Sequence, residues 1–284
     1  MSKSFTSITL FLAFAILPLT AGLVYALLYS LGIVGALSQG FSGAAWRVIW
    51  ADPTFLSSLA VSALVAATSV LLATFIALGL LSAMGTLLER PRVRFLLHFP
   101  LAIPPIIAAF LSFQWFGSSG MLARVAGQLG WIQRADDFPP LINDPYYLGV
   151  GITMLLLTFP FLLLLFLNYY QSARLEQFSQ LAATRGASPA YIRAQVVRPI
   201  LLRRAFPTLL LYGVFLFGSY EVPLLLGRQS PAMISIFISQ KFGRFNLNDL
   251  PVAYAATVIY ALVVFLIIFV FLRLSRATVQ TLPV

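Results

Sequence analysis

The side chains that most often carry enzyme chemistry are scarce in this sequence. Its 284 residues include no cysteine, a single histidine (His98) and only eight acidic residues. Without cysteine there is no thiolate nucleophile, disulfide or cysteine metal site, and one histidine argues against histidine metal sites and a histidine-assisted protease. No Gly-x-x-x-x-Gly-Lys-Ser/Thr phosphate loop occurs either. The chain therefore lacks an evident catalytic set and a nucleotide site of its own.

The polar residues that remain inside apolar sequence are candidates for a transport pathway. Glu221 stands in the stretch Phe217-Gly-Ser-Tyr-Glu-Val-Pro223. A carboxylate that faces a cavity there would attract a cationic substrate. The alternative, which the sequence alone favours, is that Glu221 reaches outer water or pairs with a neighbouring arginine. Tyr220 and Gln114 are the other pathway candidates, although a glutamine in a span more often bonds a neighbouring helix.

The elements that must position these residues are membrane spans. Hydrophobic residues make up 60% of the chain and charged residues only 9%, whereas a soluble domain has about 25% charged residues. Apolar stretches long enough to cross the bilayer as helices are expected at 8–30, 55–84, 95–116, 148–170, 205–220 and 252–272. The first stretch has a cleavable signal peptide as its alternative interpretation. The predicted fold is all-α, a polytopic membrane protein with about six transmembrane helices.

The charges predict the orientation of these spans. If the N-terminus is cytoplasmic, 12 of the 18 basic residues fall on the inner side with only Glu89 and Glu176, and six basic residues face six acidic ones outside. This is the distribution of the positive-inside rule, with both termini in the cytoplasm. The net charge of +10 thus reports topology, and no nucleic-acid partner is expected. The tryptophans agree, because all four (Trp46, Trp50, Trp115 and Trp131) fall at or beyond outer membrane ends.

The longest inner loop, residues 171–204, has the pattern of a helical hairpin. Apolar residues repeat at helical spacing up to Ala182, and Gly186 suits the left-handed position that ends a helix. Ser188 is a good N-cap and Pro189 fits the first helical position that follows. Pro199 is expected to stop the second helix.

This loop resembles the EAA loop of ATP-binding-cassette (ABC) type I importer permeases, which reads Glu-Ala-Ala, three residues, Gly, nine residues, Ile-x-Leu-Pro. In Gln180-Leu-Ala-Ala-Thr-Arg-Gly186 and Val196-Val-Arg-Pro199, three residues match (Ala182, Gly186 and Pro199) and Val196 nearly matches the isoleucine. Gln180 replaces the family's Glu, and Glu176 lies one helical turn earlier. The length and loop pattern of the chain look most like those of the polyamine-type branch of this family.

The resemblance implies a non-catalytic permease subunit of an ABC importer in the bacterial inner membrane. Its coupling loop would include Gln180, Ala182, Ala183, Gly186, Ala187, Ser188, Pro189 and Pro199. Implied partners are two cytoplasmic ATPase subunits that bind ATP and Mg²⁺, a second permease (a related chain in preference to an identical copy) and a periplasmic or extracellular substrate-binding protein. This chain itself would hold no cofactor.

The implied domains are a first helix with its outer loop (1–54), a five-helix permease core (55–275) and a short cytoplasmic tail (276–284). The competing hypothesis is a secondary transporter driven by an ion gradient, but we find neither an internal repeat nor charged residues at span centres.

Overall fold

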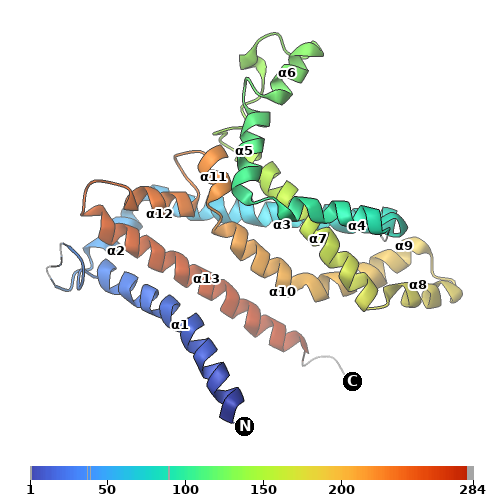
Figure 1. Cartoon of the computed structure of the whole chain (residues 1–284), viewed down its shortest axis with the longest axis horizontal. Helices are drawn as coiled ribbons and strands as arrows, with labels where there is room; N and C mark the ends of the chain where they lie inside the picture. The colour runs from blue at the N-terminus through green and yellow to red at the C-terminus, as the bar shows by residue number, and fades with distance from the viewer. Residues whose placement is uncertain (1, 37, 39, 89, 280–284) are drawn as a thin grey trace. The chain divides into compact units, whose positions relative to one another are not determined.

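The computed structural model describes residues 2–36, 38, 40–88 and 90–279 (Figure 1). Within these ranges every regular element is a helix. Six helical segments are long and apolar enough to cross a membrane: Thr9–Ser30, Pro53–Gly85, Pro105–Gln128, Leu148–Ser172, Pro189–Phe217 and Asp249–Arg273. The predicted all-α polytopic fold is therefore confirmed. Glu89 and residues 280–284 of the predicted tail lie outside the described residues, as do the side chains of Lys3 and Arg276.

The chain packs as two compact units. Unit 1 contains residues 1–59 and 234–284, and unit 2 contains residues 60–233. This grouping places the two ends of the chain in the same unit. The predicted division at residues 54 and 275 stays a prediction.

Unit 1 is built on the last helix, α13 (Asp249–Val279). It packs against α1 (Ser2–Ser30), α2 (Ala44–Ala51) and α12 (Ile234–Phe242) (Figure 1). The rings of Tyr29 and Tyr254 lie 4.3 Å apart where α1 meets α13. On α2, the indole of Trp46 donates to Ser30 Oγ at 3.1 Å, and Trp50 is half exposed. Trp46 thus links α2 to the end of α1, whereas Trp50 remains half exposed.

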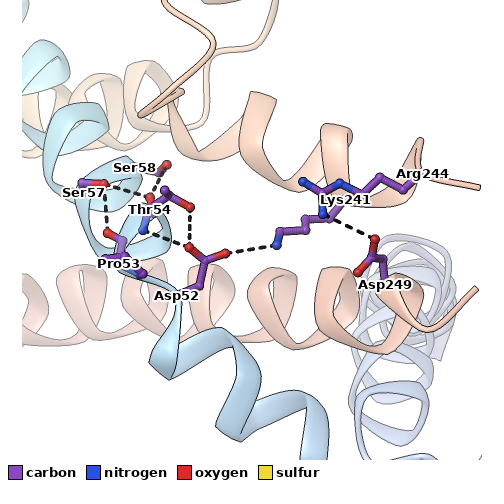
Figure 2. Close-up of polar contacts among 8 residues, drawn as sticks. All are labelled: Asp52, Pro53, Thr54, Ser57, Ser58, Lys241, Arg244 and Asp249. Carbon is purple, nitrogen blue, oxygen red and sulfur yellow. Dashed lines mark hydrogen bonds and ion pairs between the residues drawn. The ribbon is translucent and has the colours of Figure 1, made fainter. Parts of the chain in front are cut away.

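An ion pair joins the start of α3 (Pro53–Leu88) to α12 within unit 1 (Figure 2). Lys241 Nζ lies 3.0 Å from Asp52 Oδ2, and these side chains are only 10% and 20% exposed. The other carboxylate oxygen of Asp52 accepts the Thr54 N–H at 2.9 Å and the Thr54 hydroxyl. Burial by itself raises the pKa of Asp52, but the hydrogen bonds from Thr54 and Lys241 outweigh it and hold that pKa below its usual value. Asp52 therefore caps α3 and binds the ammonium group as a carboxylate.

The core of unit 2 forms around α7 (Leu148–Ser172). Its Leu162, Leu163 and Phe166 are fully buried among side chains of α3 and α10 (Arg198–Phe217). On α3 this core contains the fully buried Ala73 and Ala77 together with Leu78, Leu81 and Leu88. Pro160 lies inside α7, which continues through it as one helix.

Polar groups fix the start of α7. The buried Asp144 accepts hydrogen bonds from the N–H groups of Tyr146, Leu148 and Gly149, which satisfies donors that a helix start leaves free. The hydroxyl of Tyr147 donates to the carbonyl oxygen of Pro231. Burial, together with the nearby Asp144 and against the opposing Arg228, raises the pKa of Tyr147 to about 12. Its hydroxyl therefore stays protonated.

The third predicted span, 95–116, is wrong as one continuous helix. The chain forms α4 (Pro91–His98), the short 3₁₀ turn η1 (Phe99–Ala102) and then α5 (Pro105–Phe116). Between them Ile103 is extended, with ψ 117°, because a residue that precedes proline avoids the helical region. Pro104 and Pro105 also lack the N–H groups that would carry a helix through. These prolines therefore interrupt the span.

The remaining elements of unit 2 connect these helices. They are α6 (Met121–Gln128), the 3₁₀ turn η2 (Ala135–Asp137), α8 (Leu175–Thr184), α9 (Pro189–Ile192), the π-helical turn η3 (Arg193–Val197) and α11 (Glu221–Leu226). The chain after α10 folds back as α11 against α5 and α7.

Candidate functional site

The predicted helical hairpin follows α7 directly. Its first helix, α8, ends at a left-handed glycine, because Gly186 has φ +83°. Ala187 N–H donates to Ala182 O at 3.1 Å and Gly186 N–H donates to Ala183 O at 2.9 Å. These two bonds define a Schellman cap. A Cβ at residue 186 would meet no atom within 4 Å, so the backbone angle alone demands the glycine.

The second helix of the hairpin begins as predicted and ends differently. Ser188 Oγ accepts the Tyr191 N–H at 3.3 Å, and Pro189 is the first residue of α9. Pro199 was predicted to end this helix, and that prediction is wrong, since η3 carries the chain directly into α10. Arg198 N–H bonds Arg193 O five residues back. This wider π turn places Pro199 in the first turn of α10, where a missing N–H is tolerated.

The hairpin has an inner and an outer apolar face. Leu175, Ile192 and Val197 are buried in the core of unit 2 and hold the hairpin against α3, α7 and α10. Phe178, Leu181 and Tyr191 point away from that core and are 55%, 58% and 60% exposed. We call these three residues the outer face of the hairpin. Water contact at three large apolar side chains in so small an element marks a surface suited to a partner.

Three of the eight predicted coupling residues line one cavity behind the hairpin. It has a volume of about 500 Å³, and its lining includes Gln180, Ala183 and Pro189 together with Glu176 and Arg193. Glu176 and Gln180 thus share a face of α8, as their spacing predicts. Ala182 and Ala187 instead pack against the core of unit 2.

A second cavity, of about 380 Å³, lies where η1 and α5 meet α7, α10 and α11. Glu221 lines it at the start of α11. Across the described residues its carboxylate makes no hydrogen bond or ion pair with another side chain. Of the two alternatives that the sequence favoured, the arginine partner is not found among the described residues. Contact with outer water stays a prediction, because the Glu221 side chain is exposed and also lines the cavity.

The other predicted pathway residues do not join Glu221. Gln114 lines a separate hollow of about 510 Å³ at the C-terminal end of α5, beside Arg124 and Leu141. Tyr220 precedes α11 and lines neither of these cavities. Three aromatic residues that the sequence did not single out do line the Glu221 cavity: Phe161, Tyr212 and Phe215. Their types are ordinary for a span, so only the packing of α7 against α10 reveals them.

Comparison with known proteins places this architecture in one structural class. No protein-family model and no curated protein matches the sequence. Among solved structures, a chain of a bacterial ABC transporter involved in the import of the acidic polysaccharide alginate is similar, with a TM-score of 0.73 at 15% identity over 97% of this chain and 94% of that one. A chain of a bacterial alginate ABC transporter in complex with an alginate pentasaccharide-bound periplasmic protein gives a TM-score of 0.72 at 17% identity, over 99% and 95%. The fold is thus one found in bacterial ABC importers.

Proposed function

We propose that this chain is a membrane subunit of an ABC importer that forms half of a translocation pathway and couples to a separate ATPase. The observation that carries the proposal is the hairpin of α8 and α9, with its Schellman turn at Gly186 and its outer face of Phe178, Leu181 and Tyr191. The similarity to ABC importer chains along nearly the whole chain supports it. The chain acts as a non-catalytic subunit in this proposal.

The outer face of the hairpin is the proposed ATPase contact. Burying three large apolar side chains in a groove of a soluble subunit would give the contact its affinity, as in other helix-in-groove interfaces. ATP and Mg²⁺ belong to that partner, and a pair of ATPases would serve this chain and a second permease. The charge distribution supports a cytoplasmic hairpin and cytoplasmic termini in an inner membrane.

The proposed cargo is a small polar or charged solute delivered by a periplasmic or extracellular binding protein. One similar transporter imports an acidic polysaccharide, and another was solved with a ligand-bound periplasmic protein. Those descriptions support an importer with a binding protein. Within this class we propose a polyamine-like solute for this chain.

The test of the coupling surface is a matched pair of glycine substitutions. Gly186 and Gly130 both have positive φ (+83° and +73°), and a Cβ on either meets nothing within 4 Å. The purified complex is compared after Gly186→Asp and after Gly130→Asp for co-purified ATPase and for ATP hydrolysis. We expect Gly186→Asp to lose most of both, because aspartate strains the left-handed turn and brings a charge to the docking surface.

The control should behave as the unmodified chain, because Gly130 lies beyond α6 and far along the sequence from the hairpin. Normal ATPase association after Gly186→Asp would contradict the coupling assignment. Gradient-driven transport by the chain alone, without any ATPase, would contradict the importer proposal as a whole and favour the secondary transporter.

A further inference from the structure

The Glu221 cavity is lined by a single side chain of the charged types. Its lining comes from η1, α5, α7, α10 and α11, all within unit 2, and Glu221 is the only Asp, Glu, Lys, Arg or His among these described residues. Glu221 forms no ion pair in the described part of the chain. Its side chain is exposed, so a solute that enters the cavity can reach the carboxylate. A cation is the partner that matches this charge.

The backbone of the interrupted third span, which lines part of the cavity, is short of donors. Pro100 and Pro105 both line the cavity, and proline has no N–H. Pro104, between them in the sequence, also lacks one. The interrupted third span therefore offers fewer donors than an ordinary stretch of backbone. An anion needs N–H donors or basic side chains. The third-span part of the wall is poor in N–H donors, and the whole lining lacks basic side chains.

Aromatic side chains form another part of the wall. The rings of Phe161 on α7 and Tyr212 on α10 stack at 4.9 Å with 15° between their planes. Phe215 continues this group, with its centroid 5.7 Å from that of Tyr212. Aromatic faces attract cations and also cover the apolar methylene chain that carries an amine. A cavity of about 380 Å³ is within the usual size range of small-molecule sites.

We propose that this cavity is a substrate subsite for a primary ammonium group on a short alkyl chain, with Glu221 as the counter-ion and Phe161, Tyr212 and Phe215 as the wall along the chain. The inference rests on the proposed function and names the class of solute that the pathway accepts. It also separates this chain from importers of acidic polysaccharides, since a polyanion at this wall would meet one unpaired negative charge and no basic side chain.

The first experiment measures binding of butane-1,4-diamine to the intact complex of this chain with its partner permease and ATPases in nanodiscs by titration calorimetry. Glu221→Gln removes the charge and keeps the shape, and we expect binding to weaken about tenfold or more. Tyr212→Leu should weaken it about threefold to tenfold by removing one aromatic face. Asp136→Asn is the matched control, because Asp136 is an exposed acid on η2 outside the cavity.

A second measurement does not depend on how the variants fold. In the unmodified complex, a hydrophobic carbodiimide should label Glu221, and butane-1,4-diamine should slow that labelling at concentrations that follow its binding curve. A trimer of galacturonic acid, which is a short polyanion, should not slow it.

The outcomes separate the subsite from the proposed function. ATP hydrolysis by the same complex reports whether the chain is an ABC subunit at all. A complex that hydrolyses ATP yet binds no diamine, or binds it equally after Glu221→Gln, overturns the subsite alone. Protection of Glu221 by the galacturonate trimer in preference to the diamine also overturns it. A chain that recruits no ATPase contradicts the proposed function itself, whatever the diamine does.

Discussion

Replacing Asp52 by asparagine tests whether its ion pair with Lys241 stabilises unit 1. Asparagine keeps an oxygen that can accept the Thr54 hydrogen bonds and removes only the charge. Lys241 would then hold an ammonium group on a side chain that is 10% exposed. Removing one partner of a fully buried pair costs about 3–5 kcal/mol, and a hydrogen bond to a charged group contributes about 1.5–3 kcal/mol. Because this pair retains some contact with solvent, we expect a loss of about 2 kcal/mol, or about 30-fold in the unfolding equilibrium.

The assay is a double-mutant cycle read by equilibrium unfolding in mixed detergent micelles. Lys241→Met should cost less than Asp52→Asn, since Asp52 keeps its bonds from Thr54. The double variant should fall within about 1 kcal/mol of the unmodified chain, because neither charge is then left without its partner. Trp50, whose ring lies 6.1 Å from that of Phe55, supplies a fluorescence signal within unit 1. Strictly additive losses would refute the coupling.

The same pair has a defined pH dependence. The pKa of Asp52 is lower in the folded chain than the value of about 3.9 expected for an unfolded aspartate. The carboxylate therefore contributes its full stability above that unfolded value, and the contribution is lost as pH falls through the lower folded pKa. The difference between the unmodified chain and Asp52→Asn should be constant from pH 7 to pH 5 and should shrink below about pH 3.9. A difference that grows in acid would contradict this sign.

Two further substitutions test how the start of α7 is held. Gly149→Ala would place a Cβ 1.9 Å from the carbonyl oxygen of Leu141, so we expect a loss of about 2–3 kcal/mol in detergent unfolding. Gly151→Ala, on the same helix with nothing within 4 Å, should be neutral or stabilise by up to about 1 kcal/mol, and equal effects would contradict the close approach. Tyr147→Phe removes the hydroxyl that bonds Pro231 and should cost about 1–2 kcal/mol. That cost should not change between pH 5 and 9 because the pKa of Tyr147 is about 12, and a loss that varied with pH in this range would refute it.

The hairpin was predictable because its determinants are local. A left-handed glycine, a serine N-cap and a proline at the first helical position each act within about one helical turn. The structure places Gly186, Ser188 and Pro189 in those roles. Pro199 was misread because a proline stops a helix only if its missing N–H cannot be accommodated. The π turn of Arg193–Val197 bonds to the fifth residue back and so accommodates the missing N–H of Pro199. The spacing of residues in the sequence does not predict such a turn.

The sequence predicts only part of the Glu221 cavity. An acid in apolar sequence stands out by composition, so Glu221 could be named. Whether it faces lipid, water or a cavity depends on how far the third span continues past Pro104 and Pro105. Its interruption at Ile103 brings Pro100 and Pro105 to the same cavity as Tyr212. These residues are far apart in the sequence, so no pattern within a single span predicts that they line one cavity.

One helix connects the proposed coupling surface to the proposed subsite. At its N-terminal end α10 continues from α9 through the π turn, and nearer its C-terminal end it carries Tyr212 and Phe215, which line the Glu221 cavity. Twenty helical residues span about 30 Å, which is the thickness of the hydrocarbon core. If an ATPase moves the hairpin, α10 must either move with it or yield at the π turn, where the backbone bonding is already irregular. Motion as one body would change the aromatic wall of the cavity at each ATP cycle, and that is how a cation held at Glu221 would be released without any motor in this chain.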